Sequence, residues 1–345
     1  VQFLEPSLAI DLAGTVQSGA TSEVNFSTLS FTTGDKALDV SASQPVTISK
    51  TTQGGVTISC PNLGIDGDLS KLGPLLIVAG ELSPSNKLQG ALAFTGEITQ
   101  TGQTISLSID GTVNNYQRQN PQSTLQLPPT NLFASLNGQL DMSSDTFTIQ
   151  KDSQIGERAV DGSGSNQATL YQGTAVSWAP GAKENVHATI SYDLARLQLL
   201  LAPILPKGLT MSGRHSVDIQ ITGNLTQDKG IQMLRDLTIN PMAPAFDQIA
   251  IDGLILGPGS AGIQEQNGII TLQPASIPAN KGYVNLAGYV DLNQAEPALQ
   301  INQPLQILQN VGINSQLGST FLDFLPVAWG GDESALTVTG LANLQ

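Results

Sequence analysis

Apolar and polar residues alternate along most of this chain. In residues 104–111, isoleucine and leucine occupy every second position, and serine or aspartate occupies most of the positions between them. The same period of two recurs in residues 136–142, 216–222 and 284–292. A strand with one apolar and one polar side is typical of an antiparallel sheet with one covered face. The pattern therefore predicts a mainly β protein built on a long antiparallel sheet.

The apolar sides of these strands are the candidate binding surface, and alternation alone allows two arrangements. In the first, the sheet is strongly curved, like a folded taco, and its apolar side lines an open groove capped by a few short amphipathic helices. In the second, the apolar sides pack against one another as the core of a closed β-sandwich or barrel. The residues expected to line the groove are Leu92, Phe94, Ile105, Leu107, Ile109, Leu136, Leu140, Val217, Ile219, Ile221, Val284 and Leu286.

Glycine recurs on the apolar sides of the strands, where it costs packing and conformational entropy. We expect several of these glycines to mark sharp curvature or a bulge, most strongly Gly96, Gly138, Gly223 and Gly288. The alternative is an ordinary turn, above all at Asp-Gly pairs. The pattern of an apolar residue two positions before and after the glycine surrounds Gly14, Gly67, Gly96, Gly111, Gly138, Gly223, Gly253 and Gly288.

A strand, a helix and a second strand form a unit that recurs along the chain. The copies start near residues 56, 186 and 307. We therefore expect residues 1–345 to form one elongated β-rich unit with internal repeats. The second strand of each copy is expected to end at an apolar-Thr-Gly sequence, with its glycine at position 96, 223 or 340.

The helices of the three copies differ in the strength of their signals. In the middle copy, leucines at helical spacing follow Asp193, which is a suitable N-cap, and Pro203 and Pro206 end the run. In the first copy, the Gly73-Pro74 pair is expected to break the helix early. In the last copy, the apolar stripe consists of Leu317, Phe321, Leu322 and Leu325.

Composition narrows the class of protein. Only 12% of the 345 residues are charged, about half of the ~25% usual in soluble domains, and the net charge is −14. No basic cluster is present, which argues against nucleic acid as a partner. The single cysteine, Cys60, allows no internal disulfide and is expected to be a small buried residue. No apolar run approaches the ~18 residues of a membrane-spanning helix.

The sequence contains no recognisable catalytic or metal-binding constellation, so we expect neither an enzyme nor a bound cofactor. His187 and His215 lie in unrelated strands without ligand spacing. The sequence GPGSAG at residues 257–262 matches a dinucleotide-binding pattern, but no helix is expected to follow it, so a hairpin loop is favoured. The sequence DGSGSN at residues 161–166 resembles the start of a calcium loop but lacks the final acidic ligand, which favours a turn.

Two stretches resemble the repeats of the AsmA-like superfamily, which includes TamB- and YdbH-type envelope proteins. These are residues 192–225, a helix followed by an amphipathic strand, and residues 282–301, in which an Asn-Leu-x-Gly strand leads to a Pro-x-Leu strand. The resemblance covers residues ~60–345. It implies a strongly curved sheet around an apolar groove, binding and transfer of phospholipid or another acyl lipid, and a location in the bacterial cell envelope, periplasmic or associated with the outer membrane. It also implies envelope protein partners and membrane proximity through segments that this sequence does not contain.

Two function classes are therefore favoured over the rest. The first is a non-enzymatic protein that binds or conducts lipid acyl chains. The second is an extracellular structural or adhesive β protein, such as a surface-layer or fibre subunit, which the low charge and the abundance of Ser, Thr, Asn and Gln also fit. A polysaccharide hydrolase is disfavoured because no pair of carboxylates stands out. Since the sequence begins within an expected strand, we expect a processed protein or a segment of a longer one.

Overall fold

The protein is mainly β, as the alternation predicts. Among the residues that the structure describes, 65% lie in strands and 8% in helices, and the strands pair antiparallel. The computed structural model describes residues 8–19, 22–33, 35–50, 55–78, 82–83, 85–119, 128–202, 205–224, 231–301, 305–314, 316–317 and 340–344.

The chain divides into two compact units, which comprise residues 1–188 and 189–345. The boundary falls within one strand, β13 (Glu184–Asp193). We describe the two units in turn. The expectation of a single elongated unit, residues 1–345, stays a prediction.

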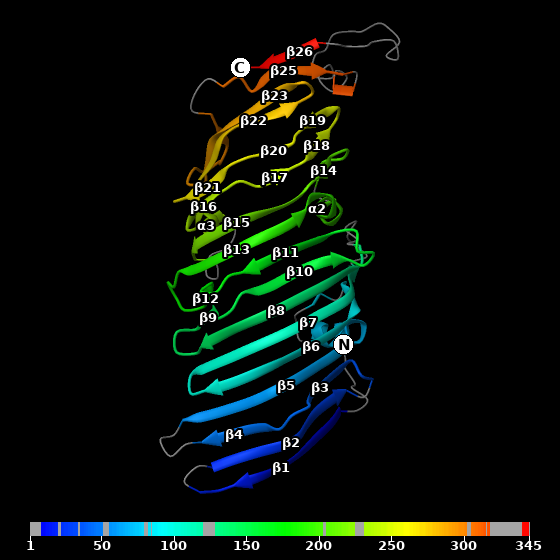
Figure 1. Ribbon diagram of the computed structural model, residues 1–345, viewed down its shortest axis with the longest axis vertical. Coiled ribbons are helices and arrows are strands. Elements are labelled where there is room, and N and C mark those ends of the chain that lie inside the picture. Colours follow the sequence, from blue (N-terminus) through cyan, green and yellow to red (C-terminus); the bar gives the residue numbers. More distant parts are fainter. Residues whose placement is uncertain are drawn as a thin grey trace. The chain divides into compact units, whose positions relative to one another are not determined.

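Unit 1 is a sheet whose strands mostly follow one another in chain order (Figure 1). Its strands β5 to β8 each have 12 to 16 residues. Strand β1 pairs only with β2 among the described strands, so it forms an edge and the described sheet is open. The elements of this unit are β1 (Leu8–Gln17), β2 (Ser22–Thr33), β3 (Leu38–Ala42), β4 (Val46–Lys50), β5 (Val56–Asp68), α1 (Leu69–Val78), β6 (Lys87–Thr101), β7 (Thr104–Gln119), β8 (Thr130–Asp141), β9 (Thr146–Ile149), β10 (Ser153–Ala159), β11 (Ser165–Leu170), β12 (Ala175–Ser177) and the first part of β13.

Unit 2 is a more irregular antiparallel assembly. One series of pairings runs from β15 through β16, β21, β22, β23 and β25 to β26, and β14, β18 and β19 join it at β22. Its elements after β13 are α2 (Leu194–Leu201), β14 (Thr210–Ser212), β15 (Arg214–Gly223), α3 (Ile231–Arg235), β16 (Thr238–Met242), β17 (Ala245–Phe246), β18 (Gln248–Ile251), β19 (Leu254–Leu256), β20 (Gly259–Ser260), β21 (Ile263–Gln266), β22 (Ile269–Ala279), β23 (Gly282–Asp291), β24 (Leu299–Gln300), β25 (Leu308–Ile313) and β26 (Gly340–Leu344).

The packed interior of unit 2 is small. Ala279, Val284 and Val311 are buried together, and half-buried leucines surround them. Strands β17 and β20 pair only with each other, as a separate two-stranded sheet. The GPGSAG sequence therefore contains a short strand, β20, and no helix begins there.

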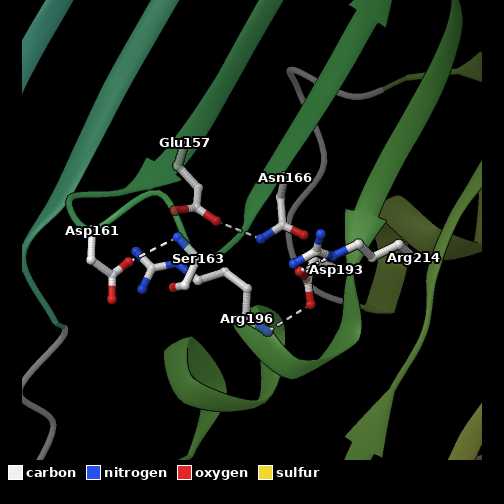
Figure 2. Close-up of polar contacts among 7 residues, drawn as sticks. All are labelled: Glu157, Asp161, Ser163, Asn166, Asp193, Arg196 and Arg214. Carbon is white, nitrogen blue, oxygen red and sulfur yellow. Dashed lines mark hydrogen bonds and ion pairs between the residues drawn. The ribbon is translucent and has the colours of Figure 1, made fainter.

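Helix α2 begins where the sequence predicts. The N-cap Asp193 has an extended backbone, and its Oδ1 atom accepts a hydrogen bond of 3.2 Å from the backbone N–H of Arg196. Its Oδ2 atom also accepts a hydrogen bond of 2.7 Å from Nε of Arg214 (Figure 2). Gln198 then links the helix to β14. Its side-chain Nε2 donates a hydrogen bond to the carbonyl of Leu209, and its Oε1 accepts one from the N–H of Met211. The predicted cap is confirmed.

Helix α1 contradicts the expected early break. It runs from Leu69 to Val78 and contains Pro74. Asp68 caps its start, since Oδ1 accepts hydrogen bonds from the backbone N–H and the hydroxyl of Ser70. Proline has no backbone N–H, so Pro74 removes one hydrogen bond from the helix, but the fixed φ of proline is compatible with a helix. Helix α1 also packs along β6. The helix stripe of the third copy lies outside the described residues except for Leu317.

The expected strand ends and turns have mixed outcomes. Strand β15 ends at Gly223 as predicted, but β6 continues past Gly96 to Thr101 and β26 starts at Gly340. The sequence expected to form a turn, residues 161–166, joins β10 and β11, and Asp161 accepts a hydrogen bond from the backbone N–H of Ser163 (Figure 2). The predicted turn is confirmed.

The candidate functional site: an apolar sheet face

Apolar residues of successive strands form rows across one face of unit 1. Residues opposite each other in an antiparallel pair place their side chains on the same face. The pairing of β1 to β10 therefore joins residues that are up to about 150 positions apart in the sequence. One row consists of Ile10, Phe31, Val40, Ile65, Phe94, Gly111, Ala134 and Ile155.

Parallel rows lie on either side of this one. Together they bring all seven of the lining residues predicted in unit 1 onto one surface, which we call the apolar face of unit 1. The rows consist of Leu38, Gly67, Leu92, Val113 and Leu132; of Leu12, Leu29, Ala42, Leu63, Gly96, Ile109 and Leu136; of Cys60, Ile98, Leu107, Gly138 and Ile149; and of Val16, Val24, Ile48, Ile58, Gln100, Ile105, Leu140, Phe147 and Val176.

The side chains of this face are only half-buried. Every predicted lining residue of unit 1 keeps an intermediate exposure, from Leu92 on β6 to Leu140 on β8. In a closed sandwich, the inner residues of both sheets interdigitate and become fully buried. At the edge strand β1, the side chains of Ile10, Leu12 and Val16 are 58%, 54% and 74% exposed. The face is therefore only partly covered.

Glycines on this face make room for aromatic rings of neighbouring strands. The ring of Phe94 lies over Gly111, directly opposite it, and the ring of Phe147 lies over Gly138. A β-carbon at either glycine would overlap the ring. Gly138 is thus explained by ring packing rather than by the expected curvature.

Other glycines lie at a bulge, at a close approach of two strands or at a positive φ, and only the bulge was expected. The pairing register shifts beside Gly14, which confirms a bulge there. At Gly96, a β-carbon would lie 2.5 Å from the carbonyl oxygen of Ser108 on the next strand. Gly223 and Gly288 have φ of 142° and 156°, which favour glycine. Gly253 instead lies in a turn, as the alternative predicts for an Asp-Gly pair.

The five lining residues predicted in unit 2 fall on two strands. Val217, Ile219 and Ile221 share the half-buried side of β15, whose other side is exposed. On β23, Val284 is only 8% exposed and packs in the buried cluster, and Leu286 packs against that cluster. Thus Val284 and Leu286 contribute to a packed core, whereas the β15 side chains are more open.

Three features of the apolar faces were missed by sequence reasoning. The β1 residues extend the rows to the sheet edge, although only the pairing register could place them there. Cys60 lies in the row of Leu107 and is half-buried rather than buried as expected, and this partial burial raises the pKa of its thiol. Glu265 of unit 2 is 2% exposed and lies in an otherwise apolar row. Its sequence, Ile-Gln-Glu-Gln, gives only the alternation that places Glu265 on the side of Ile263.

The opposite face of unit 1 is polar and carries two adjacent open depressions of about 250 and 360 Å³. Glu97 and Ser108 border both depressions. Among the described residues, no group of histidine, cysteine, aspartate or glutamate has the geometry to hold a metal ion. His187 packs beside the ring of Tyr171, and Nε2 of His215 lies 3.0 Å from Oδ1 of Asp247.

Within the described part of the chain, no helix combines the length and the apolar character that crossing a membrane requires. Comparisons with protein-family models, with curated proteins and with solved structures found no match to this chain. The apolar sheet face, defined by its pairing and exposure, is therefore the feature on which a functional proposal rests.

Proposed function

We propose that this protein binds and transfers lipid acyl chains without catalysis, along the apolar face of unit 1. The observation that carries the proposal is the set of half-buried aliphatic rows that cross the sheet from β1 to β10. Such rows offer an acyl chain a continuous apolar surface. The resemblance to AsmA-like proteins supports the same function and a place in the bacterial cell envelope.

The energetics of chain burial are sufficient for binding. Burial of each methylene contributes about 0.8 kcal/mol, so covering ten methylenes contributes about 8 kcal/mol before the cost of ordering the ligand. The rows in unit 1 contain no charged side chain from β1 to β8, and the charged Glu157 lies opposite Leu132 only at the β10 end of one row. Where the rows offer no charged group, an acyl chain binds with nearly the same free energy at neighbouring positions, which suits movement from one position to the next.

The direct test is extraction of the purified protein with organic solvent, followed by mass spectrometry. The protein is expressed in a bacterial host and purified without detergent. We expect phospholipid or another acyl lipid in amounts comparable to the protein. A polar protein of similar size from the same host is the control for carry-over. Absence of acyl lipid above that control, together with failure to bind added fluorescent acyl probe, would remove the proposal.

A second candidate function is favoured by the edge strand. Ile10, Leu12 and Val16 are exposed on a strand with one unpaired side among the described strands, and such edges pair readily with other chains. This supports the structural or adhesive class, such as a surface-layer or fibre subunit. Light scattering over a concentration series separates the two classes: growth to large assemblies without bound lipid favours the structural function, and a lipid-loaded species of constant mass favours lipid binding.

The proposed envelope location has its own test. Fractionation of cells that express the full-length natural protein should place it with the periplasm or the outer membrane. Recovery from the culture medium or the cell surface would favour the structural class instead.

A further inference from the structure

Unit 2 contains an acidic side chain in an apolar row. Pairing across β15, β16, β21, β22, β23 and β24 aligns six residues on one face, and five of them are aliphatic. The row consists of Ile221, Ile239, Glu265, Ile270, Val290 and Leu299. This is the side of β15 that carries the predicted lining residues, so the carboxyl group of Glu265 shares a face with them.

Only one of the two carboxyl oxygen atoms of Glu265 has a hydrogen-bond partner in the described structure. Oε1 of Glu265 accepts a hydrogen bond of 2.8 Å from the backbone N–H of Gly268, in the turn between β21 and β22. Oε2 has no hydrogen-bond partner and no contact with solvent in the described structure, and the whole residue is 2% exposed. A buried polar atom without a partner loses its hydrogen bonds to water and gains none from the protein, so this arrangement calls for a reason.

Hydrogen bonds connect Gly268, the partner of Glu265, to the cationic side chain of Arg235, but in the described part of the chain Arg235 does not pair with the carboxyl group of Glu265. The N–H of Leu292 donates to the carbonyl of Gly268, and Nε of Arg235 donates to the carbonyl of Leu292. Among the described residues, no ion pair joins Arg235 to Glu265. The surroundings hold the carboxyl group in place while leaving Oε2 with its full acceptor capacity.

We propose that Glu265 recognises the polar head of an acyl ligand, with Oε2 accepting a hydrogen bond from a hydroxyl or ammonium group. This inference rests on the proposed function, which concerns the face of unit 1, and extends acyl binding to the apolar row of unit 2. The row side chains Ile270 and Val290 are half-buried, so an acyl chain that covers them lies next to Glu265 in the same row. Ligands without a hydrogen-bond donor leave Oε2 unpaired and bind more weakly.

The test compares twelve-carbon competitors that displace a fluorescent acyl probe from the purified protein. Dodecylamine and 1-dodecanol carry donors with and without charge, and methyl dodecanoate carries none. We expect the wild type to bind at least one donor ligand about tenfold more tightly than the ester, as a hydrogen bond to a charged group allows. In Glu265→Gln, an N–H₂ group can replace Oε2 while the bond to Gly268 is retained, and we expect the preference to disappear with ester affinity unchanged.

Two further variants complete the design. Glu97→Gln changes a carboxylate on the polar face of unit 1 and should leave the preference intact. Glu265→Met keeps the side-chain volume without an acceptor and replaces the glutamine variant if that variant does not fold. Equal binding of ester and donor ligands by the wild type, or a preference that survives both Glu265 changes, would overturn the inference. Failure of every probe to bind would instead overturn the proposed function.

Discussion

At the scale of single residues, the two ends of the exposure range are informative. The predicted lining residues Leu107 and Ile109 are half-buried where a closed core would bury them, and Glu265 is buried where a charged residue is normally exposed. Both departures occur on apolar sheet faces. The first leaves room for a ligand, and the second leaves an oxygen atom without a partner.

The burial of Glu265 predicts a pH-dependent stability. Burial raises the pKa of its carboxyl group above the ordinary value of 4.5, and the hydrogen bond from Gly268 opposes that rise. The folded protein therefore holds this proton more tightly than the unfolded chain, and the stability is lost as the pH rises from about 4.5 through the raised pKa. Glu265→Gln removes this titration. We expect the stability of the variant relative to the wild type to increase as the pH rises towards 7.

Urea denaturation of both proteins at several pH values between 4 and 8 checks this prediction. The difference in free energy of unfolding should grow with pH and then level off. A difference that stays constant or shrinks as the pH rises would contradict it.

Two glycine substitutions test the packing of the apolar face. In Gly111→Ala, the new methyl group overlaps the ring of Phe94, and we expect a loss of about 1–3 kcal/mol. In the matched control Gly73→Ala, nothing lies within 4 Å of the new methyl group, and alanine favours the helix. This control should gain about 0.5–1 kcal/mol. Thermal unfolding measures both; equal effects would mean that Phe94 moves aside freely.

At the scale of elements, Asp193 has two separable roles in α2. It caps the helix through the N–H of Arg196, and it pairs with Arg214, whose side chain is 72% exposed. Asp193→Ala removes both roles and should cost about 1–2 kcal/mol. Asp193→Asn retains a capping oxygen and loses only an ion pair with an exposed partner, which should cost less than about 1 kcal/mol. Denaturation midpoints rank the variants, and equal losses would assign the effect to the ion pair.

The strands and one helix could be predicted from local pattern, and the reasons are physical. A strand with one covered face has apolar and polar residues at alternate positions, so the alternation predicts β7, β15 and β23. The cap at Asp193 is also local. The persistence of α1 through Pro74 depends on packing against β6, which no local pattern contains. Likewise, the continuation of β6 past Gly96 depends on the partner strands on both sides.

At the scale of the whole molecule, the candidate site could be predicted only in part. The seven lining residues of unit 1 share one face because each lies on the apolar side of its own strand. Their arrangement into rows depends on pairing register, which bulges such as the one between Cys60 and Leu63 shift by one residue. The place of Glu265 in an apolar row and the packing of Val284 into a core depend on the same information.

The apolar face of unit 1 can be tested with adjacent substitutions that point to opposite sides of β7. Leu107→Asp places a charge in the row that contains Cys60, whereas Ser108→Asp places the same charge on the polar face. Because an acyl chain cannot cover an ionised carboxylate cheaply, we expect Leu107→Asp to lower acyl-probe affinity at least tenfold and Ser108→Asp to leave it within twofold.

Alkylation of Cys60, the single cysteine, provides a readout at the proposed site itself. A bound acyl probe should slow alkylation in the wild type and in Ser108→Asp but not in Leu107→Asp, since the chain covers the row that Cys60 and Leu107 share. Circular dichroism must show that both variants keep the β fold. If the probe binds equally well to folded Leu107→Asp and leaves the alkylation of Cys60 unchanged in the wild type, acyl chains do not lie on this face. Lipid binding would then have to be sought elsewhere in the molecule.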